Sequence, residues 1–167
     1  IRIIRASTPV EGDQLNVTAQ IENTGDETAT QTVELEAGTL GTDSAEVTLS
    51  GGNSTTVELS VETAVGDAGN YTVAVNSPDD SDSTAVTVLA EANFVVNINQ
   101  TNAPIIEGDQ LQVTTTVENT GETNATQRIG LNVGDLGTAS TAVTLAAGGS
   151  VQETISVDTA SGDAGSY

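Results

Sequence analysis

The amino-acid sequence predicts an all-β protein built from two tandem immunoglobulin-like β-sandwich modules. Three observations carry this prediction: a long internal repeat, an alternation of apolar and polar residues with a period of two, and clusters of turn-forming residues between the alternating segments. Short alternating strands separated by turns at intervals of about 8–12 residues are typical of this class of sandwich.

The repeat divides the chain of 167 residues into two modules. Val10 to Leu15 returns as Ile106 to Leu111, an offset of 96 residues that holds without a gap as far as Tyr71. A period this long corresponds to a domain rather than to a solenoid unit. We therefore expect a first module over residues 1–90 and a second over residues 91–167. The recurring motifs are Glu-Gly-Asp-Gln-Leu at 11–15 and 107–111, Glu-Asn-Thr-Gly at 22–25 and 118–121, and Gly-Asp-Ala-Gly at 66–69 and 162–165.

About seven strands are expected in the first module. In the clearest of them, Leu15, Val17, Ala19 and Ile21 alternate with polar residues, which makes one face of the strand apolar. No segment combines a 3.6-residue period with a capping residue, so no helix is expected. The other alternating segments lie at 1–3, 33–35, 47–49, 57–61, 71–75 and 86–88.

Both modules contain the Asp-x-Gly-x-Tyr pattern of a tyrosine corner. In such a corner, a tyrosine near the start of the sixth strand hydrogen-bonds to the backbone just upstream. The chain has three aromatic residues, and two of them occupy this position. We expect a structural role for the residues of this pattern, which are Asp67, Gly69 and Tyr71 in the first module and Asp163, Gly165 and Tyr167 in the second.

The second module is expected to lack its last two strands, because nothing matches residues 72–89 of the first copy. One explanation is that these residues belong to a longer array, and the other is that a neighbouring subunit supplies the missing strands by β-strand addition. We favour the longer array. The connection from Leu89 to Phe94 contains no Gly, Ser or Pro, which predicts a short, semi-rigid joint.

The charge balance indicates the environment of the protein. The formal net charge is −21, from 24 acidic residues against three arginines. Such a chain repels nucleic acids and anionic membranes, and no apolar run approaches the roughly 20 residues of a membrane span. Concentrated salt screens this repulsion over about 3 Å at about 1 M. The composition therefore suggests a halophile.

The order and spacing of these features resemble those of CARDB, the cell-adhesion-related domain of bacteria and archaea. The resemblance implies an immunoglobulin-like sandwich that is repeated in secreted and cell-surface proteins, is abundant in halophilic archaea and carries no catalytic residues. The truncated second copy departs from the pattern. The first copy has the same features from Glu11 to Leu89. In the second copy the matching residues are Phe94, Val96, Ile98, Glu107–Asp109, 113–117 leading into Glu118–Gly121, 127–131, and 143–145 followed by Gly148–Ser150.

Five Asn-x-Ser/Thr sequons are candidate N-glycosylation sites. Asn16 and Asn70 are expected at solvent-facing strand positions, and Asn53 and Asn124 in turns or at a strand entrance. Asn99 is expected just after the first strand of the second module. These asparagines are Asn16, Asn53, Asn70, Asn99 and Asn124.

An acidic cluster offers one candidate metal site. Asp79, Asp80 and Asp82 could bind calcium, which takes several oxygen ligands in a flexible loop. The spacing does not match an EF-hand, and a solvated turn is the simpler interpretation. No resident cofactor is expected.

The residue inventory argues against catalysis. The chain contains no His, Cys or Lys, and so lacks the usual bases, thiol nucleophiles and zinc ligands. We expect an extracellular, non-enzymatic structural or adhesive protein whose tandem modules form a cell-surface stalk, filament or fibre. Its expected partners are other copies of itself or neighbouring surface proteins. The alternative is a non-catalytic spacer or receptor-binding module of a larger exported enzyme, a surface-layer protein or a halophilic virus fibre.

Overall fold

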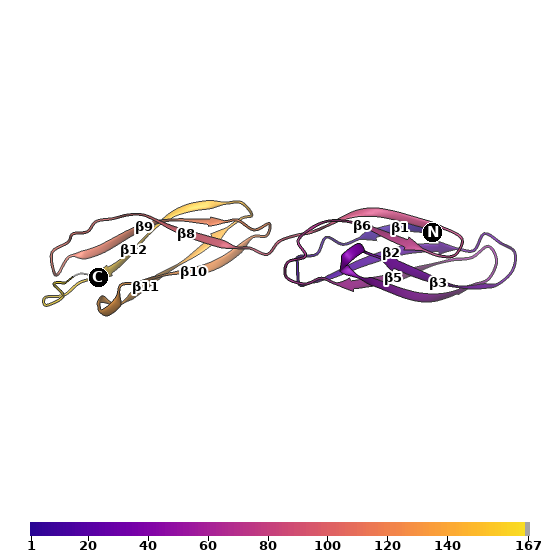
Figure 1. Ribbon diagram of the computed structural model, residues 1–167, viewed down its shortest axis with the longest axis horizontal. Helices are drawn as coiled ribbons and strands as arrows, with labels where there is room; N and C mark the ends of the chain where they lie inside the picture. The colour runs from indigo at the N-terminus through magenta and orange to yellow at the C-terminus, as the bar shows by residue number, and fades with distance from the viewer. Residues whose placement is uncertain (166–167) are drawn as a thin grey trace. The chain divides into compact units, whose positions relative to one another are not determined.

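The computed structural model describes residues 1–165 and divides the chain into two compact units (Figure 1). Unit 1 is Ile1–Ala90 and unit 2 begins at Glu91. The all-β prediction is confirmed, since the described helical segments are two three-residue 3-10 turns, Gly38–Leu40 (η1) and Gly134–Leu136 (η2). No helix in residues 1–165 is long and apolar enough to cross a membrane.

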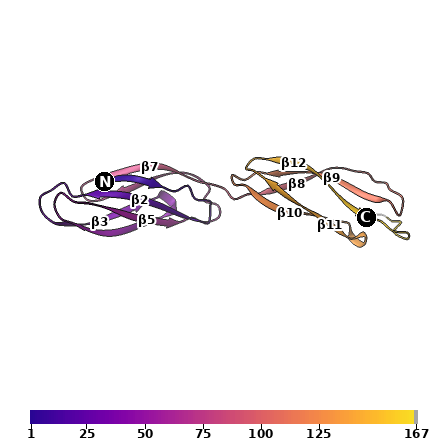
Figure 2. The same ribbon diagram turned by 180° about the vertical axis from the view of Figure 1, so that it is seen from behind.

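Unit 1 contains seven strands in two antiparallel sheets. One sheet has the order β1-β2-β5, and the other has the order β4-β3-β6-β7. Strand β7 contacts β1, so the two sheets meet along this side of the unit (Figure 2). The strands are β1 (Arg2–Ala6), β2 (Gln14–Glu22), β3 (Ala29–Glu36), β4 (Thr42–Leu49), β5 (Ser54–Glu62), β6 (Gly69–Asn76) and β7 (Ser81–Val88).

The core of unit 1 lies between these sheets and follows the alternation of the sequence. Successive side chains of a strand point to opposite faces, so every second residue of β2 enters the core. Leu15, Val17 and Ala19 from one sheet and Val33 and Leu35 from the other are fully buried. The residues between them are polar and face the solvent.

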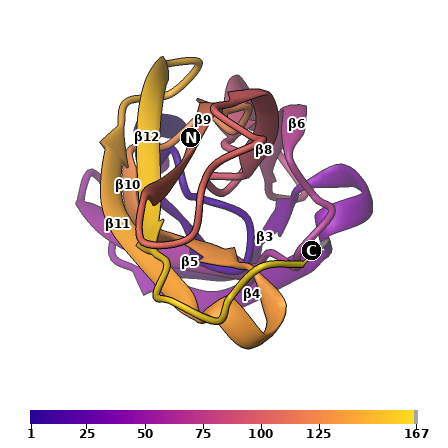
Figure 3. The same cartoon turned by 90° about the vertical axis from the view of Figure 1, so that its left-hand side faces the viewer.

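Unit 2 repeats this plan with five strands in residues 91–165. Strands β12, β9 and β8 form one antiparallel sheet in that order, and β10 and β11 form a second sheet (Figure 3). Its core contains Val117, Ile129, Val143, Leu145 and Ile155. The strands are β8 (Phe94–Thr101), β9 (Gln110–Asn119), β10 (Ala125–Asn132), β11 (Thr138–Leu145) and β12 (Ser150–Asp158).

The first strands of the two units share an irregularity. In β1 the register against β2 shifts between Ile3 and Arg5, and in β8 the register against β9 shifts between Ile98 and Gln100. Asn99 therefore lies inside β8, at this register shift. The prediction that Asn99 follows the strand was wrong, because the extra residue of the bulge lets the strand continue through it.

Candidate functional site: loop clamps and exposed asparagines

The tyrosine corner of unit 1 is a hydrogen-bonded loop at the start of β6. The Tyr71 hydroxyl donates to the backbone carbonyl of Asp67 at 2.8 Å. Asp67 in turn accepts from the backbone N–H of Ala64 at 2.8 Å through its carboxylate. The ring is half-buried, so the phenol combines apolar packing with a satisfied polar end.

The second Asp-x-Gly-x-Tyr pattern falls only in part within residues 1–165. Asp163 accepts from the backbone N–H of Ala160 at 2.7 Å, as Asp67 does from Ala64. Gly165 is exposed, and Gly69 is half-buried at the first position of β6. Tyr167 lies outside the described residues.

A glutamate connects the same loop to the turn before β2. Glu11 accepts from the backbone N–H of Gly66 at 2.6 Å, and Glu107 accepts from that of Gly162 at 2.9 Å. The hydroxyls of Thr63 and Thr159 add bonds of 2.6 and 2.7 Å to the backbone carbonyls of Asp13 and Asp109, respectively. The sequence analysis identified Glu-Gly-Asp-Gln-Leu as a recurring motif but missed this clamp.

A second clamp is formed by an asparagine in the Glu-Asn-Thr-Gly motif. In unit 2, Asn119 is fully buried, and its side-chain amide donates to the carbonyls of Thr123 (2.8 Å) and Ala146 (3.1 Å). Its oxygen accepts from the backbone N–H groups of Gly121 and Asn93, both at 3.1 Å. All four hydrogen-bonding positions of the amide are therefore used.

Asn23 plays the equivalent part in unit 1. Its amide donates to the carbonyls of Glu27 and Leu49 at 2.8 and 2.9 Å, and its oxygen accepts from Gly25 N–H at 3.0 Å. Sequence reasoning missed both asparagines. The signal that could have found them is their place in a motif that recurs at the repeat offset.

The clamp of unit 2 also holds the segment that enters the unit. A Cβ atom built on Gly121 would lie 1.9 Å from the Glu91 carbonyl oxygen and 2.7 Å from Ala92 Cα, so only glycine fits. The Thr120 N–H donates to the Asn93 carbonyl at 2.8 Å. Residues 91–93 are thus fixed to unit 2 before β8 begins.

A parallel bridge holds the residue that directly follows β7. Val10 pairs with Leu89 in parallel, outside the regular strands. The Leu89 N–H donates to the Pro9 carbonyl and the Glu11 N–H donates to the Leu89 carbonyl, both at 2.8 Å. Leu89 is therefore bonded into unit 1 and Asn93 into unit 2, with three residues between them.

The five sequon asparagines are all exposed. Asn16 and Asn70 lie on β2 and β6, at positions that face the solvent, and Asn53 directly precedes β5. Two of their side chains are hydrogen-bonded to threonines: Asn70 accepts from Thr87, and Asn99 donates to Thr116, both at 2.8 Å. Asn124 lies in the loop before β10.

The acidic cluster at 79–82 does not converge on one point. Asp79 accepts from the Gln31 side chain, and Asp82 accepts from the Ile3 backbone N–H at 2.7 Å. The Ile1 amino group donates to Asp80 at 2.5 Å and, with a backbone hydrogen bond from Ser81, lowers the pKa of that carboxyl. No three acidic side chains among residues 1–165 form a metal-binding group.

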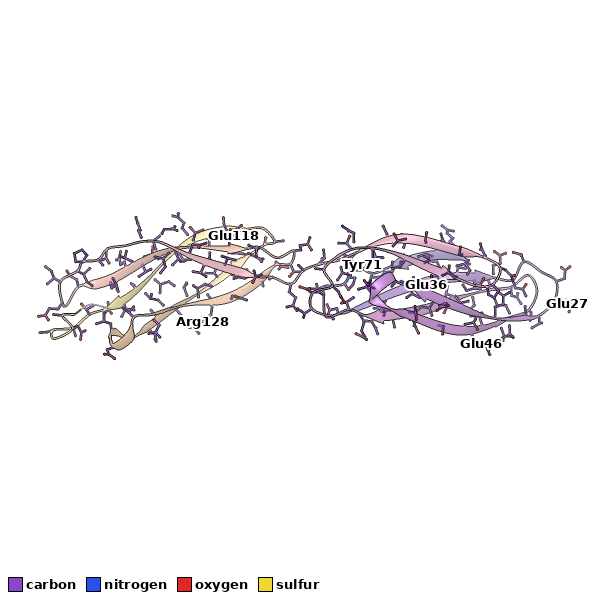
Figure 4. The ribbon with its side chains drawn as sticks, in the orientation of Figure 1. Glu27, Glu36, Glu46, Tyr71, Glu118 and Arg128 are labelled. Atoms are coloured by element: carbon purple, nitrogen blue, oxygen red, sulfur yellow. The ribbon has the colours of Figure 1, made fainter. Side chains whose placement is uncertain are left out.

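Acidic side chains are present on the surfaces of both units. Glu27 and Glu46 project outward from unit 1, as does Glu118 from unit 2 (Figure 4). Arg128, on β10, is also exposed and donates to the Ser140 hydroxyl at 2.7 Å. With a net charge of −21, each unit is surrounded by a negative field that salt screens.

Comparison with known proteins gives little functional information. Residues 8–85 match a family model described as a domain of unknown function (DUF7407). No curated protein sequence matches the chain. Among solved structures, the chain is similar to the crystal structure of red sea bream transglutaminase, with 12% sequence identity and a TM-score of 0.37. The match covers 96% of this chain and 27% of the transglutaminase chain.

Proposed function

We propose that the chain is a load-bearing, non-catalytic part of an exported protein, whose tandem sandwich modules form a cell-surface stalk, filament or fibre of a halophile. The observation that carries the proposal is the parallel bridge between Val10 and Leu89. Its two segments lie near the opposite sequence ends of unit 1, and they run in the same direction.

Two neighbouring parallel segments are sheared when the chain is pulled at its two ends. The force draws the segment at Val10 toward the N-terminal end of the chain and the segment at Leu89 toward the C-terminal end. The two must then slide past each other, so their hydrogen bonds of 2.8 Å are loaded together rather than opened one at a time. Shearing both hydrogen bonds at once requires more force than opening them one after the other.

The residues that recur between the copies support the same function. Glu11, Asn23 and Asp67 each bind the backbone of a loop, and Glu107, Asn119 and Asp163 do the same in unit 2. The recurring motifs therefore stabilise corresponding loops in the two units, which is a structural role. The exposed sequon asparagines and the acidic surface suit display outside the cell at high salt.

Surface labelling of intact cells tests the location. Antibodies raised against residues 1–167 should bind unpermeabilised cells of the source organism, and protease treatment of these cells should remove the label. The control is an antibody to a cytoplasmic protein, which should bind only after permeabilisation. Labelling that requires permeabilisation for both antibodies would overturn the proposal.

A further inference from the structure

Two of the three arginines of the chain lie together on one outer face of unit 1. Arg2 and Arg5 are three residues apart on β1, and side chains at that spacing point to opposite faces of a regular strand. The bulge in β1 inserts one extra residue between them, so Arg2 pairs with Gln20. Arg5 pairs with Thr18. Because these two partners alternate with buried residues of β2, both arginines lie on the outer face of the sheet, where they are exposed.

The arginines lie beside an exposed apolar residue and have no ion-pair partner in the chain. Ile4, between them in the sequence, is 54% exposed. Within residues 1–165, neither guanidinium forms a salt bridge, and Glu58 on the same face lies one strand further away, on β5. In a chain with 24 acidic residues, two unpaired cations beside an exposed isoleucine form a surface suited to an acidic partner. We call Arg2, Ile4 and Arg5 the basic patch.

The opposite outer face of unit 1 carries the complementary charge. Glu34 and Glu36 are exposed on β3 and alternate with buried residues, so they point away from the core. They are two residues apart, which is about 7 Å along a strand. The bulge gives Arg2 and Arg5 the same spacing, because their partners on β2 are also two residues apart. We call Glu34, Glu36 and the exposed Glu46 on the neighbouring strand β4 the acidic face (Figure 4).

Unit 2 carries neither cluster at the corresponding positions. Its first strand has uncharged residues where β1 has arginines, and these residues are exposed although the preceding chain continues along β8. Strands β10 and β11 have uncharged residues where β3 and β4 have the glutamates. The two clusters therefore occur together in one copy and are absent together from the other. The residues of unit 2 are Asn97 and Gln100 in place of Arg2 and Arg5, and Gly130, Asn132 and Ala142 in place of Glu34, Glu36 and Glu46.

We propose that the basic patch of one copy binds the acidic face of a second copy, so that chains associate through unit 1. The two arginines form charge-assisted hydrogen bonds with Glu34 and Glu36, whose spacing matches theirs. Ile4 is covered between the two sheets, which removes apolar surface from water. The core separates the basic patch from the acidic face of the same unit, so each contact leaves one of each free. The contact therefore repeats as an open series rather than closing at a dimer.

Concentrated salt favours this contact. Two chains that each carry a net charge of −21 repel each other at low ionic strength. At about 1 M salt, screening over about 3 Å suppresses that general repulsion. Charge-assisted hydrogen bonds join atoms at about 2.8 Å, within the screening length, so the direct pairs are weakened less than the general repulsion.

Sedimentation equilibrium of chain 1–167 in about 1 M NaCl tests the contact. The mean mass of the unaltered chain should increase with concentration and pass that of a dimer. Replacing Arg2 and Arg5 together by Gln should weaken the association by about tenfold. Replacing Glu34 and Glu36 together by Gln should have the same effect. Because this second variant carries less negative charge, a general reduction in repulsion would strengthen its association, so weakening identifies the specific contact.

An equimolar mixture of the two double variants tests which surfaces meet. The basic patch is intact in one variant and the acidic face in the other, so the mixture should form dimers and stop there. Restored binding also shows that both variants are folded. Matched controls remove similar charges elsewhere: Arg128→Gln, and Glu27→Gln with Glu118→Gln, change exposed residues and should not weaken the association.

The proposal fails if the unaltered chain stays monomeric at about 1 mM, or if either double variant associates as strongly as the unaltered chain. It also fails if the mixture of variants stays monomeric. A mean mass of the unaltered chain that levels off at a dimer would assign the association to a symmetric surface instead. The contact would join copies in the proposed fibre, but these results are independent of the labelling of intact cells, so each proposal can fail alone.

Discussion

At the scale of single residues, the two copies allow the same position to be compared in two settings. Gly121 and Gly25 occupy equivalent turns, but the space beside them differs. A Cβ on Gly121 would overlap the backbone of residues 91–92, whereas a Cβ on Gly25 would meet Asn23 Oδ1 at 3.3 Å. The glycine is therefore required sterically in unit 2 by the entering segment.

We predict that Gly121→Ala destabilises unit 2 by about 2 kcal/mol or more, because the backbone at Glu91 must move. The matched change Gly25→Ala should cost unit 1 clearly less, about 1 kcal/mol or below, since only a side-chain oxygen must shift slightly. Chemical denaturation followed by hydrogen exchange in each unit measures both values. Equal costs would show that the entering segment is not held at Gly121.

Tyr71→Phe removes one hydrogen bond and keeps the ring. The lost bond runs from the hydroxyl to the Asp67 carbonyl, so the free energy of unfolding of unit 1 should fall by about 1 kcal/mol. Tyr71→Ala, which also removes the half-buried ring, should cost more. If Tyr71→Phe leaves the denaturation midpoint unchanged, the corner does not contribute through its hydroxyl.

At the scale of the elements, the sequence predicts the strands well and the loop contacts poorly. The alternation at 15–21 and 57–61 depends only on local periodicity, and it matches the buried faces of β2 and β5. The bond from Gly66 to Glu11 joins residues 55 apart, and no local pattern specifies such a partner. The bulge in β8 was missed for a related reason: it changes the register without changing the composition of the strand.

The glutamate clamp should control the local opening of the loop before β6. In Glu11→Ala the Gly66 N–H loses its acceptor, so we expect its amide exchange to accelerate by about tenfold, with a loss of about 1 kcal/mol in stability. Glu46→Ala, an exposed position on β4, is the matched control and should change neither quantity. Unchanged exchange at Gly66 in Glu11→Ala would argue against the clamp.

At the scale of the whole molecule, charge repulsion should make stability depend on salt. Raising NaCl from about 0.1 M to about 1 M shortens the screening length from about 10 Å to about 3 Å, which weakens repulsion among the acidic groups. We expect the thermal midpoint to rise by at least about 5 °C, which corresponds to about 1 kcal/mol for a domain of this size.

A variant with fewer charges separates screening from other effects of salt. Replacing the exposed Glu27, Glu46 and Glu118 by Gln should reduce the rise in thermal midpoint between the two salt concentrations. If the original chain shows no increase in midpoint, or if the variant retains the full increase, repulsion between carboxylates is not what limits its stability.

The most direct test of the load-bearing role is single-molecule pulling of the chain by its two ends. We predict a force peak that releases about 300 Å of chain, the extended length of the 90 residues of unit 1. Leu89→Pro, which removes the Leu89 N–H from the parallel bridge, should lower this peak more than Leu89→Ala does. Extension of the chain without a force peak, or equal peaks for the two Leu89 variants, would contradict the proposed mechanism.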